Sequence, residues 1–292
     1  MDIILENNFL ALTVSTLGAE PVSLRKKATG EEMLWDAREG KWNRHAPVLF
    51  PWCGRLRDGH FTYKGTEYTG EGHGFARDLE HTLTETTENS LTFTLAANAI
   101  TMEKFPFVFR LTTTFILEGE TLHHDVQVEN EGDWDMPFAL GYHPGFMCPF
   151  DCEHVTEDYE IRFDTPQTPI VIDTGAGGLV TGKESVLFEN KDVIPLTDTL
   201  FANDSICMKN LTAKTMALVE KSTGRKIEMN VEGFPFVLLW SNSGKLEFVC
   251  IEPWHGLPDP VDASGDWTEK PYTVTLPKGG VWNTNLAMKF ER

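Results

Sequence analysis

Positively charged side chains are scarce in this chain. It has 25 Lys and Arg residues against 44 Asp and Glu residues, which gives a formal net charge of −19. Nucleic acids and anionic membranes bind clustered cations that neutralise their phosphates, so we expect neither as a partner. The sequence also lacks a run of about 18 consecutive apolar residues, the length that a membrane-spanning helix needs. No basic segment precedes the short apolar run that ends at Glu6, so no signal peptide is predicted and we expect a soluble, cytoplasmic protein.

Cysteine and metal-binding patterns are sparse as well. The closest pair among the five cysteines, Cys148 and Cys152, does not have the Cys-x-x-Cys spacing of a redox motif. Without an export signal we interpret the cysteines as reduced thiols and favour small buried side chains. His123 and His124 are neighbours in an alternating segment and point to opposite faces, so they do not share a metal ion. Because no histidines or cysteines have ligand spacing, we expect neither a metal nor a cofactor.

Two loop signatures of other enzyme classes are missing. The glycine-rich stretch 173–178 lacks the G-x-x-x-x-G-K-[ST] pattern and does not lead from a strand into a helix. It is therefore predicted to be a loop that does not cradle a phosphate. The chain also has no Gly-x-Ser-x-Gly sequence, so a serine hydrolase is not predicted.

Helical periodicity is confined to one short stretch, 96–104, before Phe105 and Pro106. Elsewhere apolar and polar residues alternate with a period of two, which is typical of half-buried strands. The clearest alternating segments are 91–95, 107–117, 122–128, 159–163, 227–231 and 282–290. No internal repeat or linker divides the chain. The sequence therefore predicts an all-β fold with few short helices, in which one large antiparallel sandwich or open barrel domain spans residues 1–292.

Glu252 is the most informative single residue. It ends a row of apolar residues two apart, which share one face of a strand with it. Burial without a partner would raise the pKa of its carboxyl group. A strand-end glutamate that turns to solvent or pairs with an arginine explains the pattern equally well. The neighbouring Trp254 favours a sugar site, because indole faces are common platforms for sugar C–H groups.

Two histidines lie in loops that suit a ligand. His73 stands between two glycines, where the backbone can approach a ligand closely. His143 precedes a proline, which biases its backbone toward extended geometry at a strand end. A lone histidine is more often a structural hydrogen-bonding residue. Two of them together with Glu252 make an acid–base site an equally good interpretation.

These stretches together resemble the aldose 1-epimerase (mutarotase) family, particularly its bacterial LacX-like branch. The resemblance spans essentially the whole chain, and its motifs occur in the family's order: Gly54-Arg55, His73-Gly74-Phe75-Ala76-Arg77, Gly141-Tyr142-His143-Pro144-Gly145-Phe146 and Cys250-Ile251-Glu252-Pro253-Trp254. It implies an antiparallel β-supersandwich of the galactose mutarotase type. It also implies interconversion of the α and β anomers of an aldohexose, without metal or cofactor.

The resemblance implies a role for each matching residue. Glu252 would be the general base that removes the proton from the C1 hydroxyl group, and His143 the general acid that protonates the ring oxygen. His73 would form a hydrogen bond to the sugar near these two atoms. The predicted substrate-binding residues are Arg55, Arg77, Asp204 and Trp254, with Asp204 as the candidate for the family's sugar-binding aspartate.

A hexose-6-phosphate 1-epimerase is one alternative. Its phosphate would be held by clustered arginines, for which Arg55, Arg57 and Arg77 are candidates. In an extended segment the first two would share one face. The net charge of −19 favours a free sugar instead, because it repels a dianion at long range.

Two further alternatives belong to other classes. A non-catalytic carbohydrate-binding or regulatory protein on the same fold would keep Arg55 and Trp254 but would not need the acid–base pair. A glycoside hydrolase would need two carboxylates, such as Glu252 with Asp204 or Asp259, and would leave both histidines without a role.

Overall fold

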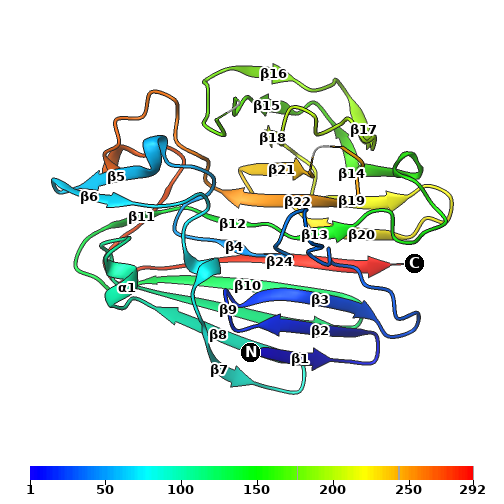
Figure 1. Cartoon of the computed structure of the whole chain (residues 1–292), viewed down its shortest axis with the longest axis horizontal. Helices are drawn as coiled ribbons and strands as arrows, with labels where there is room; N and C mark the ends of the chain where they lie inside the picture. Colours follow the sequence, from blue (N-terminus) through cyan, green and yellow to red (C-terminus); the bar gives the residue numbers. More distant parts are fainter. Residues whose placement is uncertain (176, 243, 292) are drawn as a thin grey trace.

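The computed structural model describes residues 1–175, 177–242 and 244–291, and two large antiparallel sheets form the body of this part of the chain (Figure 1). The larger sheet runs, from edge to edge, through β17 (Lys191–Pro195), β14 (Tyr159–Gln167), β19 (Thr215–Glu220), β20 (Lys226–Asn230), β24 (Val281–Glu291), β10 (Thr121–Asn130), β9 (Phe109–Glu118), β8 (Ser90–Ala96) and β7 (Thr82–Thr86). All six alternating segments predicted from the sequence lie in strands of this sheet, with Phe107 just ahead of β9 and Val231 just after β20.

The second sheet carries the residues of interest. Its order is β16 (Glu184–Val186), β15 (Ile170–Ile172), β18 (Ile206–Lys209), β21 (Phe236–Trp240), β22 (Phe248–His255), β12 (Leu140–Tyr142) and β4 (Val48–Leu49), and β13 (Gly145–Met147) also pairs with β22. Strand β22 is therefore an inner strand, with β21 along one edge and β12 and β13 along the other.

Smaller elements surround the two sheets. They are a sheet of β1 (Asp2–Glu6), β2 (Leu10–Ser15) and β3 (Glu20–Lys26), the pair β5 (His60–Tyr63) and β6 (Thr66–Thr69), and the pair β11 (Met136–Phe138) and β23 (Val274–Leu276). Short 3₁₀ helices are formed by Arg57–Gly59, Ala76–Asp78, Thr156–Asp158 and Trp267–Glu269.

The α-helix α1 (Ala99–Met102) lies inside the stretch 96–104 that the sequence predicts to be helical, so that prediction is confirmed. The Asn98 side chain caps it by accepting hydrogen bonds from the backbone N–H groups of Ile100 and Thr101. Among the described helices, none is both long and apolar enough to cross a membrane.

The core lies between the facing sides of the two large sheets. Strand β10 contributes Leu122 and Val126 to it, and β22 contributes Val249 and Ile251 from the opposite sheet. Tyr142 of β12 links the sheets by a hydrogen bond, since its hydroxyl donates to the backbone oxygen of His124 at 2.9 Å. Because hydrophobic burial is the main favourable contribution to folding, this continuous core explains why apolar side chains alternate along the strands. The prediction of an all-β, antiparallel fold with few short helices is confirmed.

Strand β22 is buried on both faces, and that property creates the site. Val249 and Ile251 face the core between the sheets, whereas Phe248 and Cys250 belong to a separate cluster with Trp35. Glu252 continues the second row, because side chains two apart in a strand share a face. Glu252 is 1% exposed, so the prediction that it lies in a buried apolar row is correct. It does not end that row, because β22 continues to His255 and the buried Trp254 follows on the same face.

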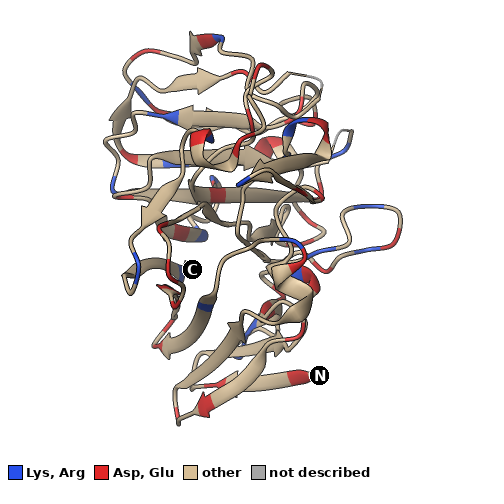
Figure 2. Cartoon of the chain, turned by 90° about the vertical axis from the view of Figure 1, so that its left-hand side faces the viewer, with Lys and Arg blue, Asp and Glu red and all other residues tan. Residues whose placement is uncertain are grey.

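The thiol and loop predictions are confirmed only in part. Cys53, Cys148, Cys207 and Cys250 are free and buried, but Cys152 is exposed, because it lies in a loop between β13 and β14. The loop predicted at 173–178 contains no strand or helix in its described residues, and Ala176 lies outside them. Figure 2 shows the Asp and Glu positions distributed over strands and loops and interspersed with those of Lys and Arg.

Candidate active site

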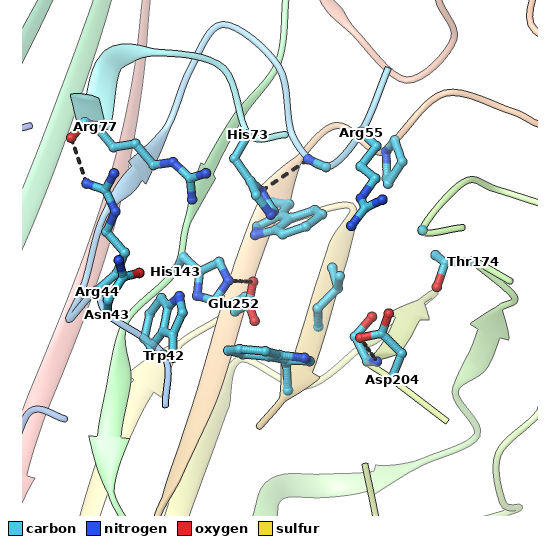
Figure 3. A pocket seen from close by; sticks show the side chains of 17 residues that line it. Trp42, Asn43, Arg44, Arg55, His73, Arg77, His143, Thr174, Asp204 and Glu252 are labelled. Carbon is cyan, nitrogen blue, oxygen red and sulfur yellow. Dashed lines mark hydrogen bonds and ion pairs between the residues drawn. The ribbon is translucent and has the colours of Figure 1, made fainter. Parts of the chain in front are cut away.

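A pocket of about 450 Å³ lies on the Glu252 face of β22 (Figure 3). The structure brings all the predicted site residues together here, although they come from distant parts of the sequence: Arg55, His73, Arg77, His143, Asp204, Glu252 and Trp254. In Figure 3 the His143–Glu252 pair is central, with Arg44 and Arg77 on one side and Arg55, Thr174 and Asp204 on the other.

Glu252 is held by regular strand pairing. It stands opposite Leu238 of β21, and its neighbour Trp254 stands opposite Gly141 of β12. Gly141 is required at this position, because a Cβ atom there would lie 2.5 Å from the Trp254 ring. The indole and the carboxylate are therefore placed side by side by a strand whose two faces are both packed.

His143 occupies the short link between β12 and β13, directly opposite Glu252. Its Nε2 atom lies 3.2 Å from Oε2 of Glu252, and its backbone N–H donates to the oxygen of Pro47. The imidazole stacks on the indole of Trp42, with ring centroids 4.7 Å apart and planes at 26°. These contacts fix the ring so that one nitrogen faces the carboxylate.

Burial shifts the protonation of this pair toward the uncharged forms. It raises the pKa of Glu252 well above the usual carboxyl value, and the nearby Asp204 carboxylate raises it further. It also lowers the pKa of His143 well below the usual imidazole value, and the positive charge of Arg77 acts in the same direction. Burial therefore favours a neutral Glu252 carboxyl group beside a neutral His143 imidazole, with one proton between them.

His73 is oriented by the loop that carries it. The backbone N–H of Gly54 donates to its Nδ1 atom at 3.2 Å, so the proton of the neutral ring is on Nε2. Burial, together with the charges of Arg77 and Arg55, lowers the pKa of His73 to about 3. His73 is therefore a neutral N–H donor at pH 7, and its ring centroid lies 5.6 Å from that of His143.

The three arginines of the pocket differ in how they are paired. Arg55 is exposed, and its guanidinium group has no ion pair among the described residues. Arg77 donates to the backbone oxygen of Gly72 and lies 4.0 Å from Asp78. Arg44 forms ion pairs with Asp78 and with Glu20, the second at 3.5 Å.

Asp204 lies across the pocket in the loop between β17 and β18, with its backbone at φ 81°. Its carboxylate accepts a hydrogen bond from the backbone N–H of Ser205 at 2.9 Å. Asp204 and Glu252 line the same pocket, so both can contact one ligand.

Arg57 does not belong to this group. The sequence suggested that Arg55 and Arg57 would share one face of an extended segment, but a 3₁₀ turn begins at Arg57 and Asp58 has φ 56°. The Arg57 guanidinium group donates to the backbone oxygen of Ala263 instead, and it does not line the pocket. The expectation of a shared face is therefore wrong, and Arg44 takes the place of Arg57 in the arginine set.

Sequence reasoning missed several residues of the pocket. Trp42, Asn43 and Arg44 come from the irregular segment ahead of β4, where no alternation or motif marks them. A tryptophan in the polar stretch 40–44 was the one available signal. Thr174 and Gly178 come from the glycine-rich loop, which contributes to the pocket wall although it lacks a phosphate-binding motif.

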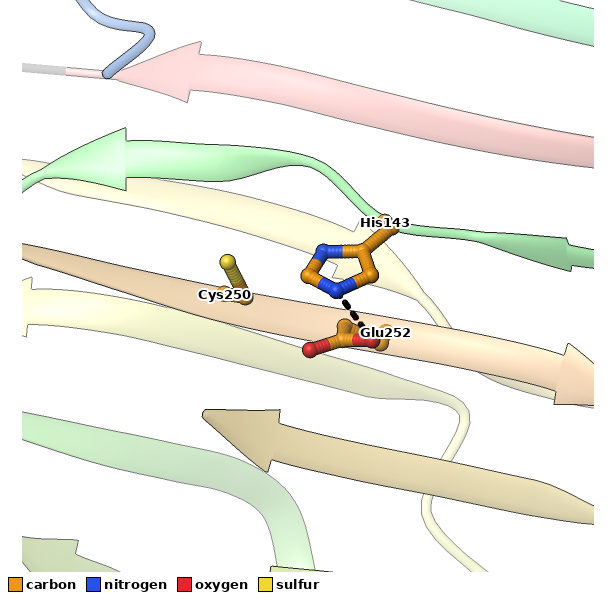
Figure 4. Close-up of side chains that lie close together, drawn as sticks. All are labelled: His143, Cys250 and Glu252. Atoms are coloured by element: carbon orange, nitrogen blue, oxygen red, sulfur yellow. Dashed lines mark ion pairs between the residues drawn. The ribbon is translucent and has the colours of Figure 1, made fainter. Parts of the chain in front are cut away.

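One group of possible metal ligands coincides with the acid–base pair (Figure 4). His143, Cys250 and Glu252 each offer an atom within 4.8 Å of the others. One of the three donors, the Nε2 atom of His143, already faces Oε2 of Glu252 at 3.2 Å, and burial raises the pKa of the Cys250 thiol well above its usual value. Metal independence nevertheless stays a prediction.

The comparisons with known proteins agree with the geometry of the site. The family model for aldose 1-epimerase matches residues 1–289, and the chain belongs to this family of sugar epimerases. It is 34% identical over 286 residues to "Protein LacX, plasmid" of Lactococcus lactis subsp. lactis, with 95% of each chain covered.

Solved structures extend the similarity to the whole fold. A galactose mutarotase related enzyme from Lactobacillus acidophilus is 32% identical, with a TM-score of 0.95 and coverage of 100% of this chain and 98% of that one. A galactose mutarotase-like protein from Lactobacillus casei is 30% identical, with a TM-score of 0.90 and coverage of 100% and 99%. The predicted fold, a β-supersandwich of the galactose mutarotase type, is therefore confirmed.

Proposed function

We propose that this protein interconverts the α and β anomers of a free aldohexose by acid–base catalysed ring opening and closure. One observation carries the proposal: the Glu252 carboxyl group and the His143 imidazole face each other at 3.2 Å inside a pocket that is large enough for a sugar. The two reacting oxygens of a cyclic sugar are bonded to the same carbon, so a base and an acid this close can serve both at once.

In the proposed reaction, the proton that the pair shares is on His143 when the cyclic sugar reacts, and Glu252 is ionised. Glu252 removes the proton from the C1 hydroxyl group while His143 delivers its proton to the ring oxygen. The bond from C1 to the ring oxygen breaks, and the open-chain aldehyde forms. After rotation about the C1–C2 bond, His143 takes the proton back from the C5 hydroxyl group, Glu252 returns its own to the aldehyde oxygen, and the other anomer closes.

At the open-chain stage, Glu252 and His143 have the protonation states that burial favours. At that stage Glu252 is neutral and His143 is neutral, and burial stabilises both forms. The pocket is therefore complementary to the ring-opened state, which is the high-energy state of the reaction. His73 would support it with its Nε2–H group, while Arg55, Arg77, Asp204 and Trp254 would bind the remaining hydroxyl groups and the sugar face.

Polarimetry on freshly dissolved α-glucose and α-galactose tests the proposal. Purified protein should accelerate the approach to the equilibrium rotation well beyond the buffer rate, in proportion to protein concentration. A matched sample of Glu252→Gln controls for general acceleration by protein or buffer. The proposal fails if the wild-type protein and this variant give the same rate for every aldohexose.

Two alternatives need the same assay. A hexose 6-phosphate as the substrate is favoured by the three arginines that line the pocket, and it is tested below. A non-catalytic carbohydrate-binding protein would bind a sugar without changing its rate of mutarotation. The cytoplasmic location and a single domain over residues 1–292 stay predictions.

A further inference from the structure

A buried ion pair lies outside the pocket but is bonded to the loops that form its wall. The Lys270 ammonium group donates to a carboxylate oxygen of Asp259 and, at 3.2 Å, to the backbone oxygen of Leu257. The two side chains are only 3% and 5% exposed, and neither residue lines the pocket.

Asp259 holds the loop that carries Arg55 at two points. Its backbone N–H donates to the Arg55 oxygen at 2.9 Å, and its second carboxylate oxygen accepts the backbone N–H of Arg57 at 2.9 Å. The same loop packs tightly at Gly54, where an added Cβ atom would lie 2.2 Å from the Pro258 ring and where φ is +69°. Asp259 therefore fixes the backbone from the Arg55 carbonyl group to the Arg57 N–H, while Pro258 packs against Gly54 on the other side of Arg55.

Asp259 also holds the glycine-rich loop, which packs beside Arg55: a Cβ atom at Gly178 would lie 3.4 Å from the Arg55 side chain. Its backbone oxygen accepts the N–H of Val180 at 2.9 Å, and the Val180 oxygen accepts the N–H of Val261 at 2.9 Å. Val180 follows Gly178 and Thr174, which line the pocket. One residue thus joins two separate pieces of the sugar-binding wall.

Asp259 is in turn close in sequence to the reacting carboxylate. It lies a few residues after the end of β22, the strand that carries Glu252. Through Asp259, the backbone of Arg55 is therefore tied to the same strand as the reacting carboxyl group. The buried carboxylate of Asp259 needs a counter-charge to keep this geometry, because a buried ion without a partner is strongly unfavourable. Lys270, placed by the 3₁₀ helix Trp267–Glu269, supplies that charge.

We propose that Lys270 and Asp259 are positioning residues that hold Arg55 and the Gly178 loop at the distance from Glu252 that a bound sugar requires. This inference rests on the proposed function. Because the pair acts on the binding wall and not on the reacting groups, its loss should raise KM for the aldose and leave kcat nearly unchanged.

The test is Lys270→Met, measured by polarimetry with the aldohexose that the wild-type protein turns over best. We expect KM to rise about 10- to 100-fold, the range usual for residues that orient ligand-binding groups, with kcat within about threefold of the wild type. Lys270→Arg retains the charge and should recover most of the loss. If Lys270→Met does not fold, Lys270→Met with Asp259→Asn removes both buried charges and replaces the single variant.

The control for a general loss of stability is Glu220→Gln. Glu220 is a fully buried carboxylate that forms an ion pair with the partly exposed Arg225, and neither residue lines the pocket. This variant should lower the melting temperature without changing KM. The positioning role is wrong if a folded Lys270→Met protein keeps the wild-type KM within about twofold, or if Glu220→Gln raises KM equally.

A double-mutant cycle with Arg55 tests whether Lys270 acts on sugar binding through Arg55 or through the pocket as a whole. In an Arg55→Ala background, Lys270→Met should change KM far less than in the wild-type background, whereas independent effects would multiply. If the wild-type protein has no turnover at all, the proposed function fails, and the same variants are compared by the Kd for galactose. An unchanged Kd in Lys270→Met would then overturn the positioning role separately.

Discussion

The Nε2 atom of His143 lies 3.2 Å from Oε2 of Glu252, and both side chains are almost entirely buried. The contact joins two separate parts of the second sheet. Strand β22 carries the carboxylate, and the link between β12 and β13 carries His143. A structural ion pair would gain nothing from surroundings that oppose both charges. An acid–base pair gains from them, because a raised Glu252 pKa and a lowered His143 pKa reduce the cost of moving one proton from His143 to Glu252.

Replacement of either partner should abolish most of the catalysis. Glu252→Gln and His143→Asn are each expected to lower kcat by about 10²- to 10⁴-fold, the usual contribution of a general acid or base. Because burial already favours the neutral form of Glu252, the glutamine variant should fold with nearly unchanged stability. Polarimetry gives the rate and circular dichroism the fold. A folded variant with near-normal turnover would remove that residue from the mechanism.

The pH dependence of kcat/KM should show a wide plateau. The pair is active with one proton, and it takes up a second proton only when His143 is protonated beside a neutral Glu252. The pKa of His143 is lowered, so the acidic limb should lie below the ordinary imidazole value of 6.5. The pKa of Glu252 is raised, so the pair should lose its single proton only at a pH well above the ordinary carboxyl pKa. An acidic limb above pH 6.5 would contradict this assignment.

Arg77 should set the position of the acidic limb. Its positive charge disfavours protonation of His143 and of His73, so its removal raises both pKa values. Arg77→Met is therefore expected to move the acidic limb of kcat/KM toward higher pH, in addition to any change in KM. Arg57→Met is a matched control, because that arginine is not in the pocket and should leave the limb in place.

The sequence predicts the strands and the central residues of the site for physical reasons that also explain its failures. Alternation identifies β9 and β10 because each buries one face, and the Gly/Pro-rich motifs mark His73 and His143. Trp42 and Arg44 lie in an irregular segment, and only long-range packing places them in the pocket. The prediction for Arg57 failed because the extended backbone ends at Leu56 and a 3₁₀ turn begins at Arg57.

Catalysis should not depend on a metal ion. The histidines and cysteines of the sequence lack the spacing of metal ligands, and the Nε2 atom of His143 lies 3.2 Å from the Glu252 carboxyl group. Exhaustive chelation should therefore leave the rate of mutarotation unchanged, and elemental analysis should find no metal in stoichiometric amount. Activity that is lost on chelation and restored by one particular divalent ion would show that the prediction is wrong.

The charge balance of the pocket bears on whether the sugar is phosphorylated. The cations Arg44, Arg55 and Arg77 are matched by the carboxylates of Glu20, Asp78 and Asp204, the first two of which pair with Arg44. Of these three arginines, only Arg55 forms no ion pair with another described residue. The whole chain carries a net charge of −19. A phosphate dianion would have to displace existing partners of Arg44 and Arg77, whereas a neutral sugar would not.

We therefore expect a higher kcat/KM for α-glucose or α-galactose than for α-glucose 6-phosphate. The long-range repulsion is screened within about 8 Å at physiological salt, so the paired state of the arginines is the stronger reason. A preference of more than ~10-fold for the phosphorylated sugar, equivalent to ~1.4 kcal/mol, would contradict the expectation. In that case Arg44→Ala and Arg77→Ala should each reduce turnover of the phosphorylated sugar selectively, while Arg57→Ala, whose guanidinium group is bonded to Ala263 outside the pocket, should not.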